Sequence, residues 1–529
     1  MPENMTLDEA FAQISALKKQ MKTLADTNEK LAKTNENLVL QNKELNANYN
    51  WLLEKLKLSK REKFGAAGDK IAMEYGQLSF FNEAEAERKP LEPEPQLEVV
   101  AHTRKKSKKK TYDEKYGDLP VEEVISDIPD EEKICEKCGS EMTFVKYETR
   151  HELKIVPAKI TVIEHKRAVY ACKSCDKNGI EGNFKAATGT PALIEKSLVS
   201  PSMMAYIMNQ KFSCAMPLFR QEQELKRMGV QLSRQTMANW MIAGARLLKP
   251  LYESLREQLT SEQILHADET PLEVLCEPGK NPTATSYMWV YRTGAHAKKP
   301  IVLYKYEVGR SGDYARKFLE NFSGYLHCDG WSGYDKVENA KRCGCWAHLR
   351  RYFVNAFEVQ QDRRDFSTLA GQALLKIREI FKVERLDPEK PSEKTEFTLD
   401  EIAELRREKS TLLVADFFDF CEQYQGVSLP KSLLGKAFAY ALNQRKTLET
   451  FLDDPRIELT NNAAERAVKP FVIGRKNWLF CYSPAGAQAS AIIYSIIETA
   501  KACGLNPQSY LEEVFEGIRA GRSVGELLP

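Results

Sequence analysis

Apolar residues recur every seven positions through the first sixty residues of the chain. Leu17, Leu24, Leu31, Leu38, Leu45 and Leu52 follow one another at this interval. Ile14, Met21, Asn28, Asn35, Asn42 and Tyr49 stand three residues before them, at the a positions if the leucines are d. The repeat predicts a parallel, two-stranded coiled coil whose buried asparagines fix the register. The alternative is a long helix packed against its own chain.

The pattern becomes that of alternating strands and helices from residue 264 onward. Three strand-like runs, ILHAD, SYMWVYRT and IVLYKY, precede a helical GDYARKFLENF, a fourth strand YLHCDG and, after KRCGCW, the helix AHLRRYFVNAFE. Helical periodicity then fills residues 361–449, broken by a polar loop, LDPEKPSEKTE. We interpret 361–449 as a helical insertion into an α/β domain, which either contacts DNA or orders a catalytic residue.

Residues 200–245 predict two helices joined by a short turn. Gly229 ends the first helix and Ser233 is the N-cap of the second. Leu225, Val230, Met237 and Trp240 would form the small core between the two helices. Arg234, Gln235 and Asn239 would face outward from the start of the second helix, as in a helix-turn-helix that reads base edges. Two-helix corners are also common without DNA.

The segment before these helices combines a linker with metal-binding spacing. Residues 84–120 have no apolar period and several prolines, and they contain six cations in seven positions: Arg104, Lys105, Lys106, Lys108, Lys109 and Lys110. Such a run either attracts phosphates or is a solvated tail. Two CxxC pairs follow, Cys135 with Cys138 and Cys172 with Cys175, around a strand-rich segment. They predict a closed, structural zinc site in a ribbon, with a redox CxxC as the alternative.

Composition narrows the class of protein. The 529 residues are 43% hydrophobic and 29% charged, with a net charge of +2. Any nucleic-acid-binding surface must therefore come from local clusters of cations and not from the total charge. No apolar run is long enough to span a membrane, and the N-terminus resembles no secretory signal. Twelve cysteines without a signal favour a reducing compartment. We therefore expect a cytoplasmic, multidomain protein.

Two predicted strands end in a carboxylate, Asp268 and Asp329. If both lie at one sheet edge, a third acid beside them would complete a two-Mg²⁺ site for phosphoryl chemistry. Glu465 is the third candidate, with Glu458 and Glu498 behind it. The alternative for Glu465 is a capping box with Asn462 at the start of a helix. Nearby cations suited to phosphate are Arg466, Lys469, Arg475 and Lys476. By contrast, Cys345–His348 predicts a strand end and helix start in the core.

Several segments together resemble the insertion sequence 66 family of bacterial DDE transposases. They are HADETPLEVL, HCDGWSGYD, CWAHLRRYF, NNAAERAVKPFVIGRKNWLF and SIIETAKACGLNP, with KREKFG, QLSFFNEAEAE and the zinc ribbon before them. The resemblance implies an RNase H-like catalytic domain with its triad on Asp268, Asp329 and Glu465. It also implies Mg²⁺, with Mn²⁺ as an alternative, action on terminal inverted repeats, and accessory proteins from the same element.

The expected fold is therefore multidomain α+β. Its parts are a coiled-coil helix (1–60), a linker with the basic run (61–120), a zinc ribbon (121–190), a helix-turn-helix region (191–255), an RNase H-like domain in two pieces (256–360 and 450–505) around the helical insertion (361–449), and a C-terminal tail (506–529). We expect a transposase that acts as a homodimer or higher oligomer on double-stranded DNA, nucleoid-associated when bound. The rival hypotheses are a nuclease or resolvase without strand transfer, and a dimeric DNA-binding regulator.

Overall fold

The computed structural model describes residues 14–15, 17–36, 38, 41, 159–171, 184–281, 284–359, 365–384 and 397–529. Residues 17–36 are helical. The apolar seam of this helix is exposed along its whole described length, at Ile14, Leu17, Met21, Leu24, Leu31 and Leu38. Predicted seam positions from Asn42 onward, the basic run and the four CxxC cysteines lie outside the described residues. Among the described residues, no helix is long and apolar enough to cross a membrane.

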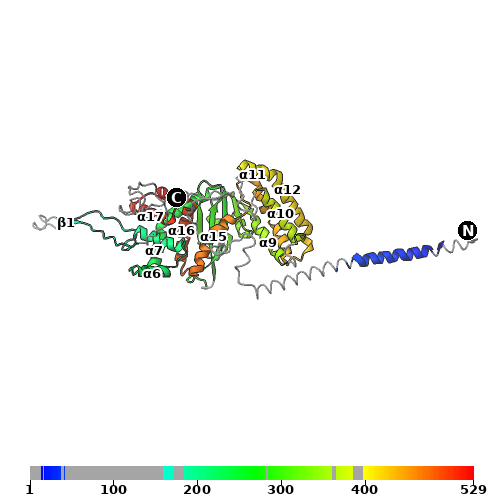
Figure 1. Cartoon of the computed structure of the whole chain (residues 1–529), viewed down its shortest axis with the longest axis horizontal. Coiled ribbons are helices and arrows are strands. Elements are labelled where there is room, and N and C mark those ends of the chain that lie inside the picture. Colours follow the sequence, from blue (N-terminus) through cyan, green and yellow to red (C-terminus); the bar gives the residue numbers. More distant parts are fainter. Residues whose placement is uncertain are drawn as a thin grey trace, which may run out of the picture. The chain divides into compact units, whose positions relative to one another are not determined.

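A five-stranded mixed sheet forms the centre of the α/β part (Figure 1). Its strands are β3 (Ile264–Glu273), β4 (Thr285–Thr293), β5 (Val302–Glu307), β6 (Gly324–Cys328) and β7 (Ala340–Gly344). The spatial order is β5-β4-β3-β6-β7, with β3, β4 and β5 antiparallel and β6 and β7 parallel to β3. The four predicted strands and the helix α8 (Gly312–Phe318) are confirmed, and the segment AKRCG forms the fifth strand.

Helices cover the β5 side of the sheet. They are α7 (Arg234–Thr260), α16 (Pro484–Ala502) and α17 (Pro507–Ala520), which share one hydrophobic core with β3, β4 and β5. Ser495 and Thr499 of α16 accept hydrogen bonds from the backbone N–H groups of Tyr304 (2.8 Å) and Val302 (3.0 Å). The edge of β5 is therefore covered by a helix, which protects it from pairing with another strand. The predicted tail at 506–529 contains α17 and the short helix η7 (Val524–Leu527).

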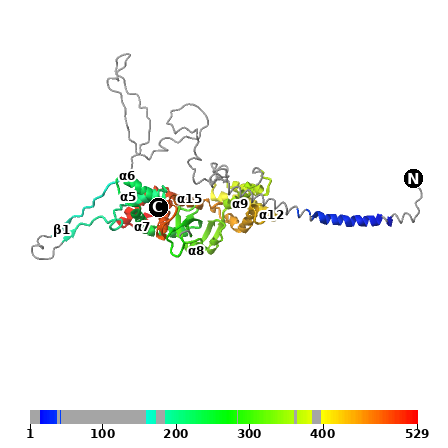
Figure 2. The ribbon, with the colours of Figure 1, turned by 90° about the horizontal axis from the view of Figure 1, so that it is seen from below.

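Three helices precede the sheet in the chain and pack against one another: α5 (Pro201–Phe212), α6 (Leu218–Arg227) and the start of α7 (Figure 2). Gly229 follows α6 with a φ of 86°, in the left-handed region that glycine favours after a helix. The Ser233 side chain accepts a hydrogen bond from Thr236 N, as predicted for an N-cap. The corner between α6 and α7 has the expected core, with Leu225, Met237 and Trp240 buried and Val230 packed against them. The helix α7 runs past residue 255, the predicted end of the helix-turn-helix region, and its second half packs into the core of the sheet.

The predicted insertion is helical, as expected, and has its own core. It follows α9 (Trp346–Glu358) and contains α10 (Leu369–Val383), α11 (Leu399–Leu405), the π-helix η4 (Arg406–Ser410), α12 (Thr411–Tyr424), η5 (Gln425–Val427), α13 (Leu433–Asn443) and α14 (Arg445–Glu449), with η6 (Thr450–Asp453) beyond. Trp346 is fully buried among Phe417, Phe418 and Phe451, and its Nε1 donates to Leu448 O at 3.0 Å. Residues Cys345 and Trp346 thus lie in the core, as predicted.

A buried arginine joins the insertion to the chain that follows it. Arg406 is 3% exposed and forms a two-pronged ion pair with Glu384 at 2.5 and 3.0 Å. Its guanidinium also donates to the carbonyls of Phe451 (2.5 Å), Asp454 (2.8 Å) and Ile457 (2.8 Å). Since residues 454–461 lead directly into the next helix, we call them the strap. The arginine therefore fixes the start of the strap to the insertion.

The remaining described elements are β1 (Val169–Ala171) and β2 (Phe184–Ala186), which pair antiparallel, η3 (Ser332–Lys336), and α15 (Asn462–Trp478). The β1–β2 pair brackets Cys172 and Cys175 in sequence. β1 lies at the end of the strand-rich segment that the sequence predicts between the two CxxC pairs, whereas β2 lies beyond Cys175 and outside that segment.

We predict that Arg406→Ala lowers the free energy of unfolding by about 3–5 kcal/mol, because it leaves the Glu384 charge buried without a partner. Arg407→Ala is the matched control. Arg407 is the next residue, its side chain is 76% exposed, and its loss should change stability by less than about 0.5 kcal/mol. Urea denaturation of the two variants measures the difference, and equal midpoints would contradict the prediction.

Candidate active site

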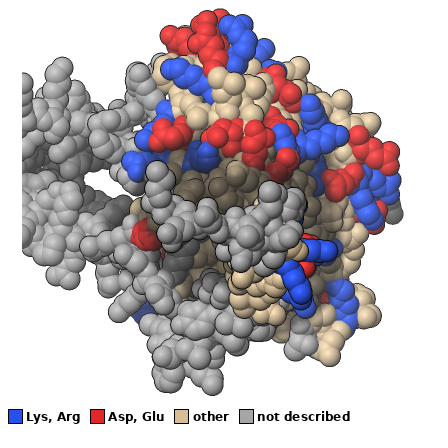
Figure 3. All heavy atoms as spheres, turned by 90° about the vertical axis from the view of Figure 1, so that its right-hand side faces the viewer, with Lys and Arg blue, Asp and Glu red and all other residues tan. Residues whose placement is uncertain are grey.

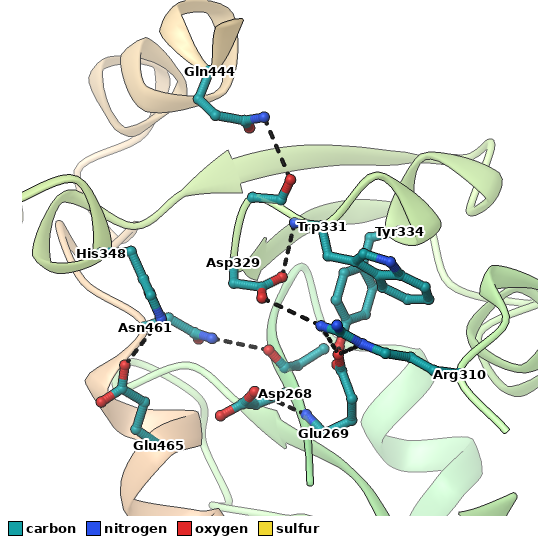
Figure 4. A network of polar contacts seen from close by, with 12 residues as sticks. Asp268, Glu269, Arg310, Asp329, Trp331, Tyr334, His348, Gln444, Asn461 and Glu465 are labelled. Carbon is teal, nitrogen blue, oxygen red and sulfur yellow. Dashed lines mark hydrogen bonds and ion pairs between the residues drawn. The ribbon is translucent and has the colours of Figure 1, made fainter. Parts of the chain in front are cut away.

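The register of two parallel strands brings the first two predicted carboxylates together. β3 and β6 pair through Ile264 with Tyr325, Leu265 with Leu326, and His266 with His327. Asp268 on β3 and Asp329, directly after β6, each lie two residues beyond the last of these pairs. Figure 4 shows both side chains on the same side of the sheet, as the strand pattern predicts.

Glu465 reaches the same region from the first turn of α15 (Figure 4). The predicted capping box does not form. The N-cap is Asn461 rather than Asn462, and its side chain makes no capping hydrogen bond. Glu465 Oε1 is buried and has no hydrogen-bond partner. It lies 3.5 Å from His348 Nε2 and 3.5 Å from Arg351 Nη2, both on α9. The capping interpretation is therefore wrong: the Glu465 carboxylate faces His348 and Arg351 of α9, at the border of the site.

Negative charge on one carboxylate of the site makes ionisation of its neighbours less favourable. Burial raises the pKa of Asp268 to about 8, and the negative charges of Glu269, Asp329 and Glu465 add to this effect. The Glu269 backbone N–H opposes it by donating to Asp268 Oδ1 at 2.8 Å. Burial also raises the pKa of Glu269. A concentration of negative charge that burial makes unfavourable is stabilised by a nearby cation.

One such cation belongs to the protein. The Arg310 guanidinium contacts Glu269 Oε1 at 2.5 and 2.6 Å and lies 3.6 Å from Asp329 Oδ2. It also lies over the ring of Trp331, 4.6 Å from its centroid. Tyr334 donates its hydroxyl to the other oxygen of Glu269. Glu269, Arg310 and Tyr334 are not among the predicted site residues, although the HADET segment places Glu269 directly after Asp268.

A buried amide holds the start of α15 against the sheet. Asn461 is 1% exposed; its Nδ2 donates to Ala267 O at 2.9 Å, and its backbone N–H donates to Cys345 Sγ at 3.2 Å. Its Oδ1 accepts from His266 Nδ1 at 2.9 Å. The Asn461 side chain thus joins the start of α15, four positions before Glu465, to the residue of β3 that precedes Asp268.

Two stacked histidines complete the attachment of the strap. The rings of His266 and His327 are parallel within 7°, with centroids 5.0 Å apart, and both are fully buried. His327 Nε2 donates to Glu458 O at 2.8 Å. Glu458 Oε2 lies 2.7 Å from His266 Nε2, an ion-pair distance without good hydrogen-bond alignment. Burial lowers the pKa of His327 to about 3, with the neighbouring His266 adding to the shift.

The other predicted site residues lie apart from this cluster. Glu498 pairs with Lys501 at 2.7 Å on α16, and Glu458 is engaged by His266. The predicted phosphate-binding cations all belong to α15: Arg466 and Lys476 are exposed, and Lys469 and Arg475 are half-buried. Arg475 also donates to Thr270 Oγ1 at 3.2 Å. On α7, Arg234, Gln235 and Asn239 are exposed, and Gln235 donates to Asn239 Oδ1 at 3.3 Å.

The chemistry of the carboxylates suits a hard divalent cation. Asp268, Asp329 and Glu465 present only oxygen donors, the ligands that Mg²⁺ prefers, and one oxygen of Glu465 is buried without a hydrogen bond. Within the described ranges, however, no three His, Cys, Asp or Glu side chains lie close enough to hold an ion as they stand. Side chains now held by Arg310, His348 and Arg351 would have to rotate inward to bind one.

Comparison with known protein families decides the class of this protein. A model described as "Transposase IS66 family" matches residues 196–489, more than half of the chain and all three carboxylates. The chain belongs to the IS66 family of transposases. A model for the zinc-finger binding domain of transposase IS66 matches residues 132–176, which include all four CxxC cysteines, and one for the IS66 C-terminal element matches 495–529. The IS66 zinc-finger match supports a structural zinc.

Three similar proteins come from Sinorhizobium fredii. The uncharacterized protein y4qI is 32% identical over 420 residues, which cover 77% of this chain and 74% of that protein. The uncharacterized proteins y4jD and y4hP are 29% and 26% identical and cover 76% and 79% of this IS66 transposase. The matched portions span 78% and 76% of those two proteins.

We predict that the site destabilises the metal-free IS66 transposase at high pH. The folded pKa of Asp268 is raised to about 8, above the usual value, so the protein loses stability as the pH rises from about 4 to about 8. In chelator at about pH 8.5, Asp268→Asn should raise the unfolding temperature by at least about 2 °C. The gap should narrow toward pH 5. Thermal scans across this range measure it, and parallel curves for the two proteins would contradict the prediction.

Proposed function

We propose that this IS66 transposase binds the terminal inverted repeats of its element and catalyses Mg²⁺-dependent strand cleavage and strand transfer through Asp268, Asp329 and Glu465. The observation that carries the proposal is that three acids from separate elements border one region of the fold. Two lie at the same level of neighbouring parallel strands, and the third lies at the start of the helix tied to that level by Asn461. The strand order β5-β4-β3-β6-β7 supports an RNase H-like domain.

The three carboxylates would hold the metal ions. When bound, Mg²⁺ would activate the attacking oxygen and stabilise the leaving oxygen of a phosphodiester. His348 and Arg351 would hold Glu465 on the α9 side of the site until a metal binds, and would release it to turn inward as a ligand. Arg310 would remain paired with Glu269, which is 2% exposed, and would present the outer edge of its guanidinium toward a phosphate. Buried Tyr334 fixes Glu269 and so also limits where Arg310 can lie.

Several surfaces would contact double-stranded DNA. The cations of α15 begin one residue after Glu465, which suits the phosphates on either side of the cleaved bond. The exposed Arg234, Gln235 and Asn239 stand on the first turns of α7, where the second helix of a helix-turn-helix meets base edges. The zinc ribbon, held by Cys135, Cys138, Cys172 and Cys175, and the run of Arg104, Lys105, Lys106, Lys108, Lys109 and Lys110 would add contacts that depend on salt.

The remaining parts would organise the complex. In the visible part of the face over α10–α12, acidic and basic side chains are interspersed (Figure 3). This mixture favours a positioning role for the insertion over a DNA-binding one. The exposed leucine seam of residues 17–38 supports a homodimer or higher oligomer through the coiled coil, which would bring two element ends together. Accessory proteins of the same element would act with it.

We predict that Asp268→Ala, Asp329→Ala and Glu465→Gln each leave end binding intact and abolish strand cleavage, because each removes a metal ligand. The substrate is a supercoiled plasmid that carries the DNA flanking the gene, with Mg²⁺ added and 3′ ends mapped. Glu513→Gln, an exposed acid on α17, is the matched control and should cleave like wild type.

The products decide among the rival functions. Nicks at fixed positions followed by joined products support a transposase, whereas nicks without joining would indicate a nuclease or resolvase. Binding that ignores metal, without cleavage even after the accessory proteins are added, would indicate a regulator. Cleavage retained by Glu465→Gln would move the third ligand to another residue.

We predict that purified protein contains about one zinc per chain and that Cys135→Ser loses it, because a tetrahedral structural site needs all four thiolates. Metal analysis of protein prepared without chelator measures the ratio. Cys214→Ser, which changes an exposed cysteine outside the CxxC pairs, should keep the zinc. Zinc-free wild-type protein would refute the site.

A further inference from the structure

The chain leaves α15 through a strained turn that exposes large apolar side chains. Leu479 has a φ of 67° and a ψ of −52°, and Phe480 N donates to Trp478 O at 2.9 Å; together these form a γ-turn of positive φ, which is rare and strained. Leu479 is 66% exposed, Phe480 41% and Tyr482 71%. We call these three residues the apolar tip. A strained backbone that presents apolar groups to solvent gives the fold no stability of its own, which points to a binding role.

The tip is held firmly by what surrounds it. Cys481, between Phe480 and Tyr482, is buried; its N–H donates to Glu273 O and its carbonyl accepts from Leu275 N, both at 3.0 Å. Tyr482 O accepts from Cys276 N at 2.9 Å. These bonds add the tip as a short parallel pairing to the end of β3, the strand of Asp268. Apolar side chains are therefore presented outward from a fixed backbone.

The base of the tip is anchored to α5. The Trp478 ring packs edge-on against Phe212, with centroids 6.3 Å apart, and Lys211 Nζ lies 3.9 Å from the centroid of the same ring. Gly474, one turn earlier, leaves room for this indole, since a Cβ there would lie 2.2 Å from the Trp478 ring. The tip thus sits where α15, β3 and α5 meet.

A cationic stripe leads from the catalytic end of α15 to the tip. Arg466, Lys469, Ile473 and Lys476 follow at helical spacing and share one face, on which Arg466 and Lys476 are exposed. Glu465 stands at one end of this stripe and Leu479 at the other. A polyanion lying along the stripe with one phosphate at the carboxylates would therefore meet the tip. This charge complementarity selects duplex DNA, rather than another protein, as the occupant.

We propose that the apolar tip inserts into the base stack of the bound element end, about six base pairs from the cleaved bond. The fourteen residues from Glu465 to Leu479 rise by roughly 21 Å along the helix axis. At about 3.4 Å per base pair, this length spans six steps of B-form DNA laid along α15. Apolar side chains that wedge between base pairs unstack and kink the duplex. The inference rests on the proposed function of the same site.

The test uses full-length protein and a duplex of the mapped element end, with 2-aminopurine placed singly at each of the first twelve positions beside the cleavage site. This base fluoresces more strongly when unstacked. With wild type we expect a rise of about three-fold, confined to positions about five to seven. The variant Phe480→Ser with Tyr482→Ser should lose the rise and cleave about ten-fold more slowly. A mismatch at the responding position should restore its rate, because the step is then already unstacked.

Two control variants separate the tip from general damage. Leu479→Gly keeps the positive-φ turn without the leucine side chain, and it should weaken the signal while leaving the unfolding temperature unchanged or higher. Leu412→Ser changes a leucine on α12 that is 69% exposed, like the tip, and should behave as wild type.

Each outcome bears on one proposal. If wild type binds and cuts but no position responds, or the tip variant keeps the response, DNA insertion is wrong. A tip variant that loses activity only when accessory proteins are present, with no fluorescence change in wild type, would make the tip a protein contact. Protein that neither binds nor cuts the end would overturn the transposase proposal itself, and this inference with it.

Discussion

The hydrogen bonds of one buried amide determine whether the three acids can meet. Asn461 lies 195 residues from its partner His266, and the whole insertion separates them in the chain. Its side chain bonds Ala267 O beside Asp268, and the helix that carries Glu465 starts at the next residue. Leaving these buried groups without partners would cost more than the bonds contribute, because water cannot reach them. The third carboxylate is therefore placed by a contact to the strand of the first.

The strap gives the insertion a share in this placement. Arg406 holds the carbonyls of Phe451, Asp454 and Ile457 from the insertion side, and the stacked histidines hold Glu458 from the sheet side. A chain segment fixed at both flanks cannot shift without breaking one set of bonds. Two roles are expected for residues 361–449. The role of ordering the third carboxylate is supported by the buried hydrogen bonds that link the insertion to the strap. The interspersed charge of the visible face gives DNA contact no comparable support.

Local patterns predicted the elements but not their long-range contacts. Short strand-like runs marked β3 and β6, and their carboxylates fell at one level because parallel strands keep register. Helix-start signals placed Ser233 correctly. They also placed the start of α15 at Asn461 and Asn462, and only the alternative of a capping box from Asn462 to Glu465 failed. Asn461 stands at the N-cap, and its side chain bonds a strand that precedes the insertion in the chain. Arg310 and His348 were missed because no local period links them to Asp329 or Glu465, which lie 19 and 117 positions further along the chain.

The strengths of the ion pairs differ in a way that suits a site able to open. Arg310 contacts Glu269 at 2.5 Å in a nearly dry position but reaches Asp329 only at 3.6 Å, where the carboxylate is 28% exposed. The contacts of Glu465 with His348 and Arg351 are equally long, at 3.5 Å. Long, partly solvated pairs contribute little, so exchanging them for a divalent cation costs little. The short pair with Glu269 would persist, and it would keep a positive side chain beside the reacting phosphate while Asp329 and Glu465 turn toward the metal.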